Sequence, residues 1–339
     1  MIHRIMNTWR PERFHYHHRL ARVSDHFEGW YIKIVDPGDE QPYAIIPGVF
    51  LGQDRHAFIQ VLDGRTGTGR YHRFALEQFT ASRDTFDVRI GPNRFHAGGF
   101  TLDLDRTDAA GEQRVKGEIE MGELTPWPVT FFSPGVMGPY SFIPFMQCNH
   151  GILSMDHGLM GFLNVDGRET RYDGGRGYME KDWGKAFPEG YAWTQSNHFD
   201  RCGICVTASV ATIPWVTGEF RGFLVGFLID GELHRFMTYN GGVIEALTVC
   251  ERQLRLTIRN RTHRHEVDSE KSEGGMLMAP YERQMLERVA ETMTSIIRLR
   301  FTTLNGEERY SGTGRNACLE IQGNLEKVLD GQPGMDKSD

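Results

Sequence analysis

The chain has 339 residues, of which 39% are apolar and 24% charged. This composition excludes a disordered chain and leaves room for one large all-β domain or two domains of ordinary size. The formal charge of −7 disfavours nucleic acid as a partner, because no overall positive field would attract a phosphate backbone. The 39 glycines favour many tight turns, and therefore β structure.

Strand signals follow one another along almost the whole chain. Short runs rich in β-branched and aromatic residues recur, and many alternate in polarity, as half-buried strands do. Between them stand Asp-Gly or Asn-Gly pairs, which suit the positive φ angles of two-residue hairpin turns. These pairs are Asp63-Gly64, Asp166-Gly167, Asp230-Gly231 and Asn305-Gly306. The sequence therefore predicts an all-β protein, arranged as a meander or a barrel.

Two segments depart from this pattern. Residues 124–144 contain five prolines and several aromatic residues, which a central strand does not accommodate, so we expect a long apolar connection that acts as a cap or lid. Residues 280–293 begin with proline, are rich in Glu, Arg and Leu, and place Tyr281, Met285 and Val289 roughly on one face. This pattern predicts one short helix.

Two similar β domains are expected. Residues 161–172 and 226–236 share a Gly-Phe-Leu start, an Asp-Gly turn and a following Glu and Arg, although hairpin chemistry alone could produce the match. A glycine-rich run at residues 173–177 favours a boundary there. We expect one domain at residues 1–172, a second at 173–325 and a polar tail at 326–339.

The segment GYMEKDWG, residues 177–184, is a candidate catalytic site. In an extended strand, Tyr178, Glu180 and Asp182 lie on one face. Two neighbouring carboxylates can hold different protonation states, which general acid catalysis requires. Alternatively, both carboxylates form ordinary salt bridges with surface arginines.

A second candidate is the segment YAWTQSNHF, residues 191–199. Trp193, Gln195 and Asn197 share one face of an extended strand. Amides flanked by aromatic rings are typical of an apolar cavity wall with a few hydrogen-bonding groups. Trp193 as plain core is the alternative interpretation.

A third candidate, FEGWYIK at residues 27–33, combines Glu28 with Trp30 and Tyr31. Burial of Glu28 would require a partner for its charge.

Metal and redox sites are disfavoured. His150 and His157 are an odd number of residues apart and would face opposite sides of a straight strand, so structural roles are expected. Four N-terminal histidines lack cysteine partners and ligand spacing, which favours solvated side chains: His15, His17, His18 and His26. We find no glycine-rich phosphate loop. The N-terminus has no apolar signal region and the five cysteines are scattered, so a cytoplasmic location is expected.

Four blocks of the sequence together resemble the tocopherol cyclase family. They are FEGWYIK at residues 27–33, HAFIQV at 56–61, residues 137–157, and residues 177–199. The resemblance implies two tandem lipocalin-like β-barrels or sandwiches, similar to bacterial carotenoid hydratase and AttH-like proteins. It also implies the cyclisation of a prenylated hydroquinone.

This chemistry suggests roles for the candidate residues. Closing a chromanol ring requires a proton delivered to an alkene, transient cation character, and attack by a phenol oxygen, with no cofactor. Glu180 and Asp182 are the expected catalytic acids. Aromatic rings stabilise cations, and amides can orient the quinol oxygens. The expected substrate-binding residues are Trp193, Gln195, Asn197, Trp30, Tyr31, Glu28 and Tyr178.

The expected partner is a hydrophobic small molecule, a prenyl quinol or a polyene, collected through peripheral contact with a membrane. A non-catalytic carrier for the same molecule is the alternative function, because a carrier needs no proton donor.

Overall fold

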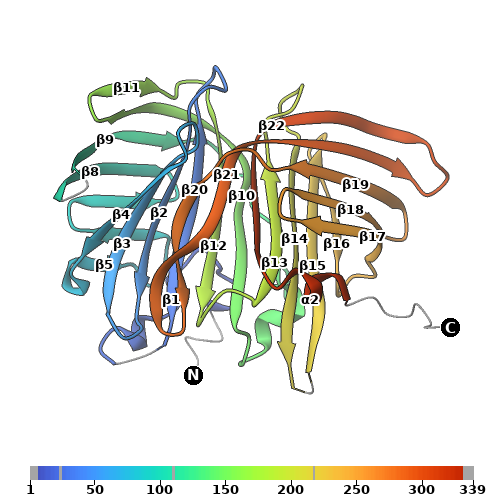
Figure 1. Cartoon of the computed structure of the whole chain (residues 1–339), viewed down its shortest axis with the longest axis horizontal. Coiled ribbons are helices and arrows are strands. Elements are labelled where there is room, and N and C mark those ends of the chain that lie inside the picture. The colour runs from blue at the N-terminus through green and yellow to red at the C-terminus, as the bar shows by residue number, and fades with distance from the viewer. Residues whose placement is uncertain (1–6, 23–24, 109–110, 217, 331–339) are drawn as a thin grey trace. The chain divides into compact units, whose positions relative to one another are not determined.

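The computed structural model describes residues 7–22, 25–108, 111–216 and 218–330 (Figure 1). Contacts divide the chain into two compact units. The first unit extends to Phe187 and also includes Gly274–Val289, while the second comprises Pro188–Glu273 and the residues from Ala290 onward. Because contacts alone define these units, the domain bounds 1–172 and 173–325 stay a prediction.

A twelve-stranded antiparallel sheet forms most of the first unit. Its strands follow the order β4-β3-β2-β1-β12-β10-β9-β8-β7-β6-β5, and β11 pairs with β10. The strand bounds are β1 Phe27–Val35, β2 Pro42–Phe50, β3 His56–Asp63, β4 Thr68–Phe74, β5 Phe79–Ala81, β6 Asp87–Ile90, β7 Asn93–His96, β8 Gly99–Asp108, β9 Gly111–Met121, β10 Cys148–Val165, β11 Arg168–Arg171 and β12 Arg176–Gly184.

The main core of the first unit lies on one face of this sheet. Because side chains alternate along a strand, Trp30, Ile32 and Ile34 of β1 point to the same side and are completely buried in this core. Met179 of β12 lies directly opposite Ile32 and joins them. The other face of β1 and β12 is therefore free to carry polar groups.

Further strands form a second, ten-stranded sheet in the order β16-β15-β14-β13-β22-β21-β19-β18-β17, with β20 paired to β21. By their contacts, β20 and the first residues of β21 belong to the first unit. The bounds are β13 Gly190–Ser196, β14 Cys205–Trp215, β15 Gly218–Ile229, β16 Glu232–Met237, β17 Val243–Cys250, β18 Gln253–Arg259, β19 His263–Glu270, β20 Gly275–Tyr281, β21 Gln284–Thr303 and β22 Glu308–Gly323.

Two of the predicted hairpin turns have the expected backbone. Asp166 and Gly167 connect β10 to β11 with φ angles of 53° and 87°, and Asp230 and Gly231 connect β15 to β16 with 51° and 77°. Positive φ at both central positions matches the right-handed twist of the flanking strands. These two hairpin predictions are confirmed. The two-residue turns predicted at Asp63-Gly64 and Asn305-Gly306 are wrong, because longer turns connect β3 to β4 and β21 to β22 and, of these four residues, only Gly306 has a positive φ.

The predicted helix at residues 280–293 is wrong. The chain there ends β20, turns at Glu282 and Arg283 with φ angles of 45° and 66°, and continues as β21. Pairing decides the outcome, because β21 forms ladders with β20 and with β22, and the latter includes Thr292 opposite Leu319. Such long-range pairing overrides the local helix propensity of Glu, Arg and Leu.

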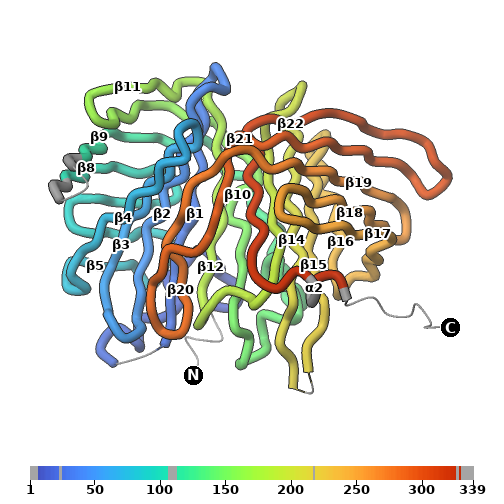
Figure 2. The backbone as a smooth tube through the Cα atoms, viewed as in Figure 1, coloured from blue at the N-terminus to red at the C-terminus, as the bar shows by residue number. Residues whose placement is uncertain are grey.

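The β20–β21 hairpin, orange in Figure 2, packs on the first unit. The side chain of Gln60 on β3 donates a 2.9 Å hydrogen bond to the carbonyl of Met278 and accepts one of 2.8 Å from its amide. A Cβ atom at Gly69 would collide with the carbonyl of Met276. This glycine therefore permits the close approach of the hairpin to β4.

A short helix, α2, spans Leu325–Asp330. Val328 is completely buried against the core of the second unit, and Leu325 and Leu329 pack beside it. Residues 331–339 of the predicted polar tail lie outside the described residues.

The connection at residues 124–144 is irregular, as its prolines indicate. It contains one short 3-10 helix, η3, at Gly138–Phe142. Trp127, Val136 and Met137 are buried, while Phe131 and Phe132 are exposed. The segment is therefore packed on the body of the first unit by part of its apolar side chains only.

Candidate functional site

The face of β12 opposite the main core carries Tyr178, Glu180 and Asp182. Antiparallel pairing places Tyr31 of β1 opposite Glu180, and Lys33 opposite Tyr178. From the other side, His150 of β10 lies opposite Asp182. Directly opposed residues share a face of the sheet, so three strands contribute side chains to one polar cluster.

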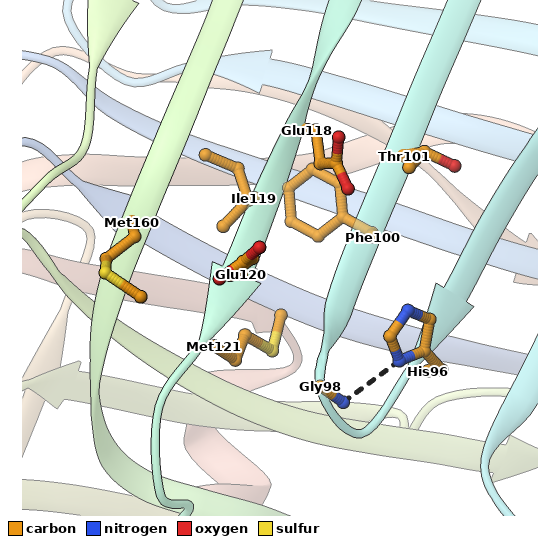
Figure 3. Close-up of a pocket in the computed structure, with 9 residues that line it drawn as sticks. All are labelled: His96, Gly98, Phe100, Thr101, Glu118, Ile119, Glu120, Met121 and Met160. Atoms are coloured by element: carbon orange, nitrogen blue, oxygen red, sulfur yellow. Dashed lines mark hydrogen bonds between the residues drawn. The ribbon is translucent and has the colours of Figure 1, made fainter.

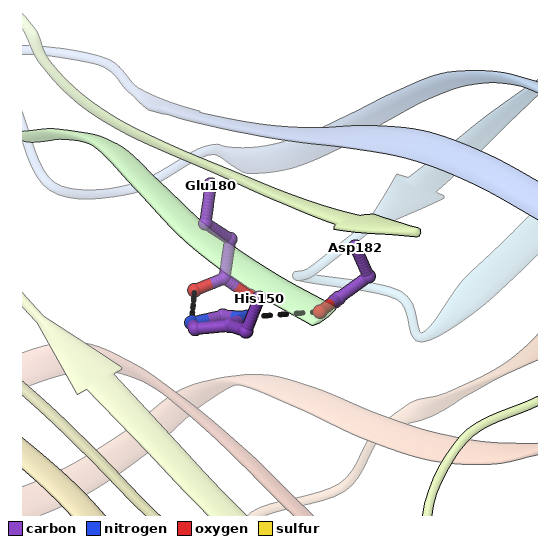
Figure 4. Close-up of side chains that lie close together, drawn as sticks. All are labelled: His150, Glu180 and Asp182. Atoms are coloured by element: carbon purple, nitrogen blue, oxygen red, sulfur yellow. Dashed lines mark hydrogen bonds and ion pairs between the residues drawn. The ribbon is translucent and has the colours of Figure 1, made fainter. Parts of the chain in front are cut away.

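Four of these side chains form a chain of contacts, which we call the polar chain: Tyr178, Glu180, His150 and Asp182. Figure 4 shows the last three of them. The Tyr178 hydroxyl donates a 2.6 Å hydrogen bond to Oε2 of Glu180. Nε2 of His150 lies 3.6 Å from the same oxygen, and Nδ1 lies 2.9 Å from Oδ1 of Asp182. One imidazole therefore connects the two carboxylates through different nitrogens.

Burial differs along the polar chain. Tyr178 is completely buried and Glu180 is 5% exposed, whereas the Asp182 side chain is 25% exposed. Cys148 lies next to the exposed end, with Sγ 3.9 Å from Oδ1 of Asp182. Burial and the charge of Asp182 raise the pKa of the Cys148 thiol, so this cysteine stays protonated at neutral pH and is a poor nucleophile.

The three groups are also candidate ligands of a divalent cation, because ligand atoms of His150, Glu180 and Asp182 lie within 4.8 Å of one another. One ring nitrogen would have to bind the ion together with both carboxylates. The imidazole instead turns Nδ1 to Asp182 and Nε2 to Glu180. This orientation suits proton transfer along the ring better than chelation of one ion.

Glu28 and Trp30 lie on the opposite face of the same strands. Nζ of the completely buried Lys181 is 2.5 Å from Oε1 of Glu28 and lies between the rings of Trp30 and Trp183, 4.8 Å and 4.7 Å from their centroids. The partner that a buried Glu28 requires is therefore Lys181. The structure does not bring Glu28 and Trp30 together with Glu180 and Asp182.

Lys181 also binds the N-terminal segment. Its ammonium group donates to the carbonyls of Pro11, at 3.0 Å, and Arg13, and to Nδ1 of His15 at 2.9 Å. The backbone amide of His15 donates to both oxygens of Glu28 at 2.9 and 3.0 Å. We call this set the Lys181 anchor. The expectation that His15 is solvated is wrong, because its ring belongs to this buried network.

The charges of the Lys181 anchor depend on one another. Burial lowers the pKa of Lys181, and the carboxylate of Glu28 opposes this effect. Burial acts to raise the pKa of Glu28, but the ammonium of Lys181 and the hydrogen bond from His15 lower it overall. Burial and Lys181 lower the pKa of His15. Glu28 and Lys181 therefore form an ion pair beside a neutral imidazole.

The second unit contains the other predicted contacts. Trp193 and Gln195 lie on β13, and Asn197 is the residue directly after that strand. Gln195 is completely buried, and Trp193 and Asn197 are 5% and 1% exposed. They alternate with Ala192, which joins the core of that unit, and so share the face opposite this core. They form a set of their own, and their substrate-binding role stays a prediction.

Sequence reasoning missed Lys33 in the cluster, and it considered His150 without predicting its contacts with Glu180 and Asp182. The pairing of His150 with Asp182 joins strands 32 residues apart, and β10 contains two register shifts. Periodicity within one segment does not reveal such a pairing. The sequence does contain a signal for Lys33: it lies two residues after Tyr31 in the same strand, and alternation therefore places both side chains on one face.

A groove elsewhere on the first unit contains none of the predicted site residues (Figure 3). It lies over β7, β8, β9 and β10, and His96 accepts a 3.1 Å hydrogen bond from the amide of Gly98 at its edge. Glu118 and Glu120 add two carboxylates. This lining is more polar than the apolar cavity wall that a hydrophobic ligand favours.

Comparison with known proteins places these features in a family. The model of the family described as tocopherol cyclase-like matches residues 21–323, which include the polar chain and most of both sheets. The chain belongs to the tocopherol cyclase-like family. The resemblance expected from the sequence blocks is thus confirmed.

The relatives of this family member are distant. The chloroplastic tocopherol cyclase of Zea mays is 25% identical over 189 residues, which are 54% of this chain and 39% of that protein. The chain spans half or less of the length of the plant relatives that it matches.

Solved structures confirm the lipocalin-like, two-sheet fold. The crystal structure of CghA with Sch210972 matches with a TM-score of 0.54 at 11% identity, covering 88% of this chain and 89% of the other. A protein from Nitrosomonas europaea described as AttH matches with a TM-score of 0.50 at 13% identity, covering 88% and 92%. Within the described residues of this family member, no helix has the length and apolar character needed to cross a bilayer.

Proposed function

We propose that the protein catalyses acid-promoted cyclisation of a prenylated hydroquinone or a similar hydrophobic alkene. The observation that supports this proposal most strongly is the polar chain, in which one imidazole connects two carboxylates of different burial. Membership of the tocopherol cyclase-like family and the name of the Zea mays relative point to the same chemistry.

Glu180 is the proposed proton donor. When Nδ1 of His150 donates to Asp182, the neutral ring directs the lone pair of Nε2 toward Glu180. An ionised carboxylate facing this lone pair is unfavourable in a buried site, so one proton is held by Glu180 or by Nε2. The pair of Glu180 and His150 therefore stores the proton that the reaction needs.

The proposed reaction returns this proton. Transfer from Glu180 to an alkene carbon forms a C–H bond and leaves a tertiary cation. The phenol oxygen of the same molecule attacks this cation and forms the C–O bond, and its proton passes back to Glu180 and His150. Substrate and product are isomers, so the balance requires neither an oxidant nor a reductant.

The neighbouring groups have separate proposed roles. Asp182 is a positioning residue, because its hydrogen bond fixes the ring of His150 and stabilises the imidazolium. Tyr178 donates to Glu180 and, with Tyr31, is a proposed substrate contact on the same face.

The other predicted substrate contacts come from the sequence alone. Stabilisation of the cation by Trp30 and Trp193, orientation of the quinol oxygens by Gln195 and Asn197, and a substrate contact by Glu28 stay predictions.

The test is Glu180→Gln, which keeps an oxygen to accept from Tyr178 but removes the acid. We expect turnover of a prenylated hydroquinone to fall by roughly 10²-fold, with unchanged ligand affinity and melting temperature. Glu169→Gln, at an exposed position of β11, is the matched control and should retain full turnover.

Two results would contradict the proposal. Unchanged turnover in Glu180→Gln would remove Glu180 as the donor. Binding of the prenylated hydroquinone by the wild type without any turnover would favour the carrier function instead.

A further inference from the structure

The connection between β9 and β10 exposes an unusual group of apolar side chains. Phe131 and Phe132 are 72% and 79% exposed, and Phe142, Phe145 and Val129 are each more than two fifths exposed. We call these five residues the phenylalanine patch. Singly exposed apolar residues are common on protein surfaces, but several large ones on one connection mark an interaction site.

The patch is held in place by Trp9. The Trp9 ring stacks on Phe131 at a centroid distance of 5.8 Å and meets Phe142 edge to face at 5.3 Å. Its Nε1 donates a 3.0 Å hydrogen bond to the carbonyl of Phe131. Phe132 in turn packs edge to face on Phe131 at 5.0 Å. These three phenylalanine rings therefore belong to a packed aromatic arrangement, so their exposure is a stable property of this surface.

The same connection lacks charge. Residues 124–149 contain no Asp, Glu, Lys, Arg or His. Insertion into the boundary between lipid headgroups and acyl chains buries apolar side chains without the cost of desolvating ions. An interface with a protein partner ordinarily has a rim of polar residues around such rings. Absence of charge over this length fits a lipid surface better.

We propose that the phenylalanine patch binds the surface of a lipid bilayer. The connection has no basic residue, and Arg10 beside Trp9 is paired with Glu12 at 2.7 Å. Hydrophobic insertion is therefore the driving force, and anionic lipid is not required. The biological reason for lipid binding rests on the proposed function, because a prenylated hydroquinone dissolves in lipid and must be collected there. The binding itself does not depend on that function.

The experiment measures co-sedimentation of the full chain with phosphatidylcholine vesicles at low and high salt. We expect the wild type to sediment with the vesicles equally at both salt concentrations. Phe131→Ser combined with Phe132→Ser should lower the partition coefficient at least about tenfold. The melting temperature should fall only slightly, because Phe131 loses its contact with Trp9 but the two side chains are 72% and 79% exposed.

The control is Met160→Ser combined with Leu304→Ser, two apolar residues that are 55% and 48% exposed outside the patch. It should bind vesicles like the wild type. Equal loss of binding in the control, absence of wild-type binding, or binding that needs anionic lipid and disappears at high salt would each overturn the proposal.

Sedimentation velocity without lipid separates a further outcome. A wild-type dimer that the two phenylalanine substitutions convert to a monomer, without vesicle binding, would overturn the proposal in favour of a protein interface. Vesicle binding with no turnover of a prenylated hydroquinone would leave the lipid surface in place while the proposed function fails.

Discussion

Removal of the Lys181 ammonium group tests the buried anchor most directly. In Lys181→Met the side chain keeps its length, but Glu28 loses a partner at 2.5 Å and the Pro11 carbonyl loses a donor at 3.0 Å. Both charged side chains are 0% exposed, so no water replaces the lost partner. Breaking a buried pair from one side costs about 3–5 kcal/mol, and we expect the free energy of unfolding to fall by about 4 kcal/mol.

Urea denaturation followed by tryptophan fluorescence measures this loss, because Trp30 and Trp183 flank the ammonium group. Lys116→Met is the control. Lys116 pairs with Asp103 at 3.6 Å with side chains 73% and 58% exposed, and exposed pairs contribute about 0–1 kcal/mol.

A double substitution separates the pair from its surroundings. Glu28→Gln with Lys181→Met removes both charges, so the loss should be smaller than the sum of the single losses by about 1–3 kcal/mol. A loss in Lys181→Met no greater than that in Lys116→Met would refute the assignment of a buried ion pair. Additive losses in the double variant would refute the coupling.

Two further predictions concern stability. Burial lowers the pKa of His157 to about 4, so between pH 6.5 and 4 the unfolded chain binds a proton that the folded protein does not. The free energy of unfolding should therefore decrease as the pH is lowered from 6.5 to 4, by about 3 kcal/mol from this residue. His157→Gln should flatten the curve of unfolding free energy against pH, and an unaltered slope would show that His157 titrates normally. In the β20–β21 turn, Arg283 has a φ of 66°, so Arg283→Gly should raise the melting temperature, with a gain of about 1 kcal/mol. Calorimetry measures this gain, and a lower melting temperature would count against strain at Arg283.

Local chemistry made part of the fold predictable. The turns at Asp166-Gly167 and Asp230-Gly231 depend on two adjacent residues that tolerate positive φ, so a short window predicts them. The same kind of pair at Asp63-Gly64 lies in a longer turn between β3 and β4, because strand pairing sets the length of the connection. The helix prediction for residues 284–293 failed for the opposite reason. Their strand state depends on pairing with β20 and, at Glu291 and Thr292, with residues of β22 that lie much later in the chain. A helix-like composition gives no hint of these partners.

The candidate site shows the same limit. Alternation within β12 placed Glu180 and Asp182 on one face, and elementary electrostatics required a partner for a buried Glu28. The identity of each partner was not predictable. His150 reaches Asp182 from another strand, and Lys181 reaches Glu28 across the strand pair. Both contacts follow from the sheet register, which is a property of the assembled sheet.

The alternation of β12 has a consequence for how this protein can change during evolution. Even-numbered positions from 178 to 182 belong to the polar chain, while Lys181 between them secures the N-terminal segment on the other side. Substitutions in the polar chain and substitutions in the anchor therefore fall on alternate residues of one strand, with side chains on opposite faces of the sheet. If the polar chain is the catalytic site that we propose, its residues can be exchanged without touching the contacts that hold the N-terminal segment.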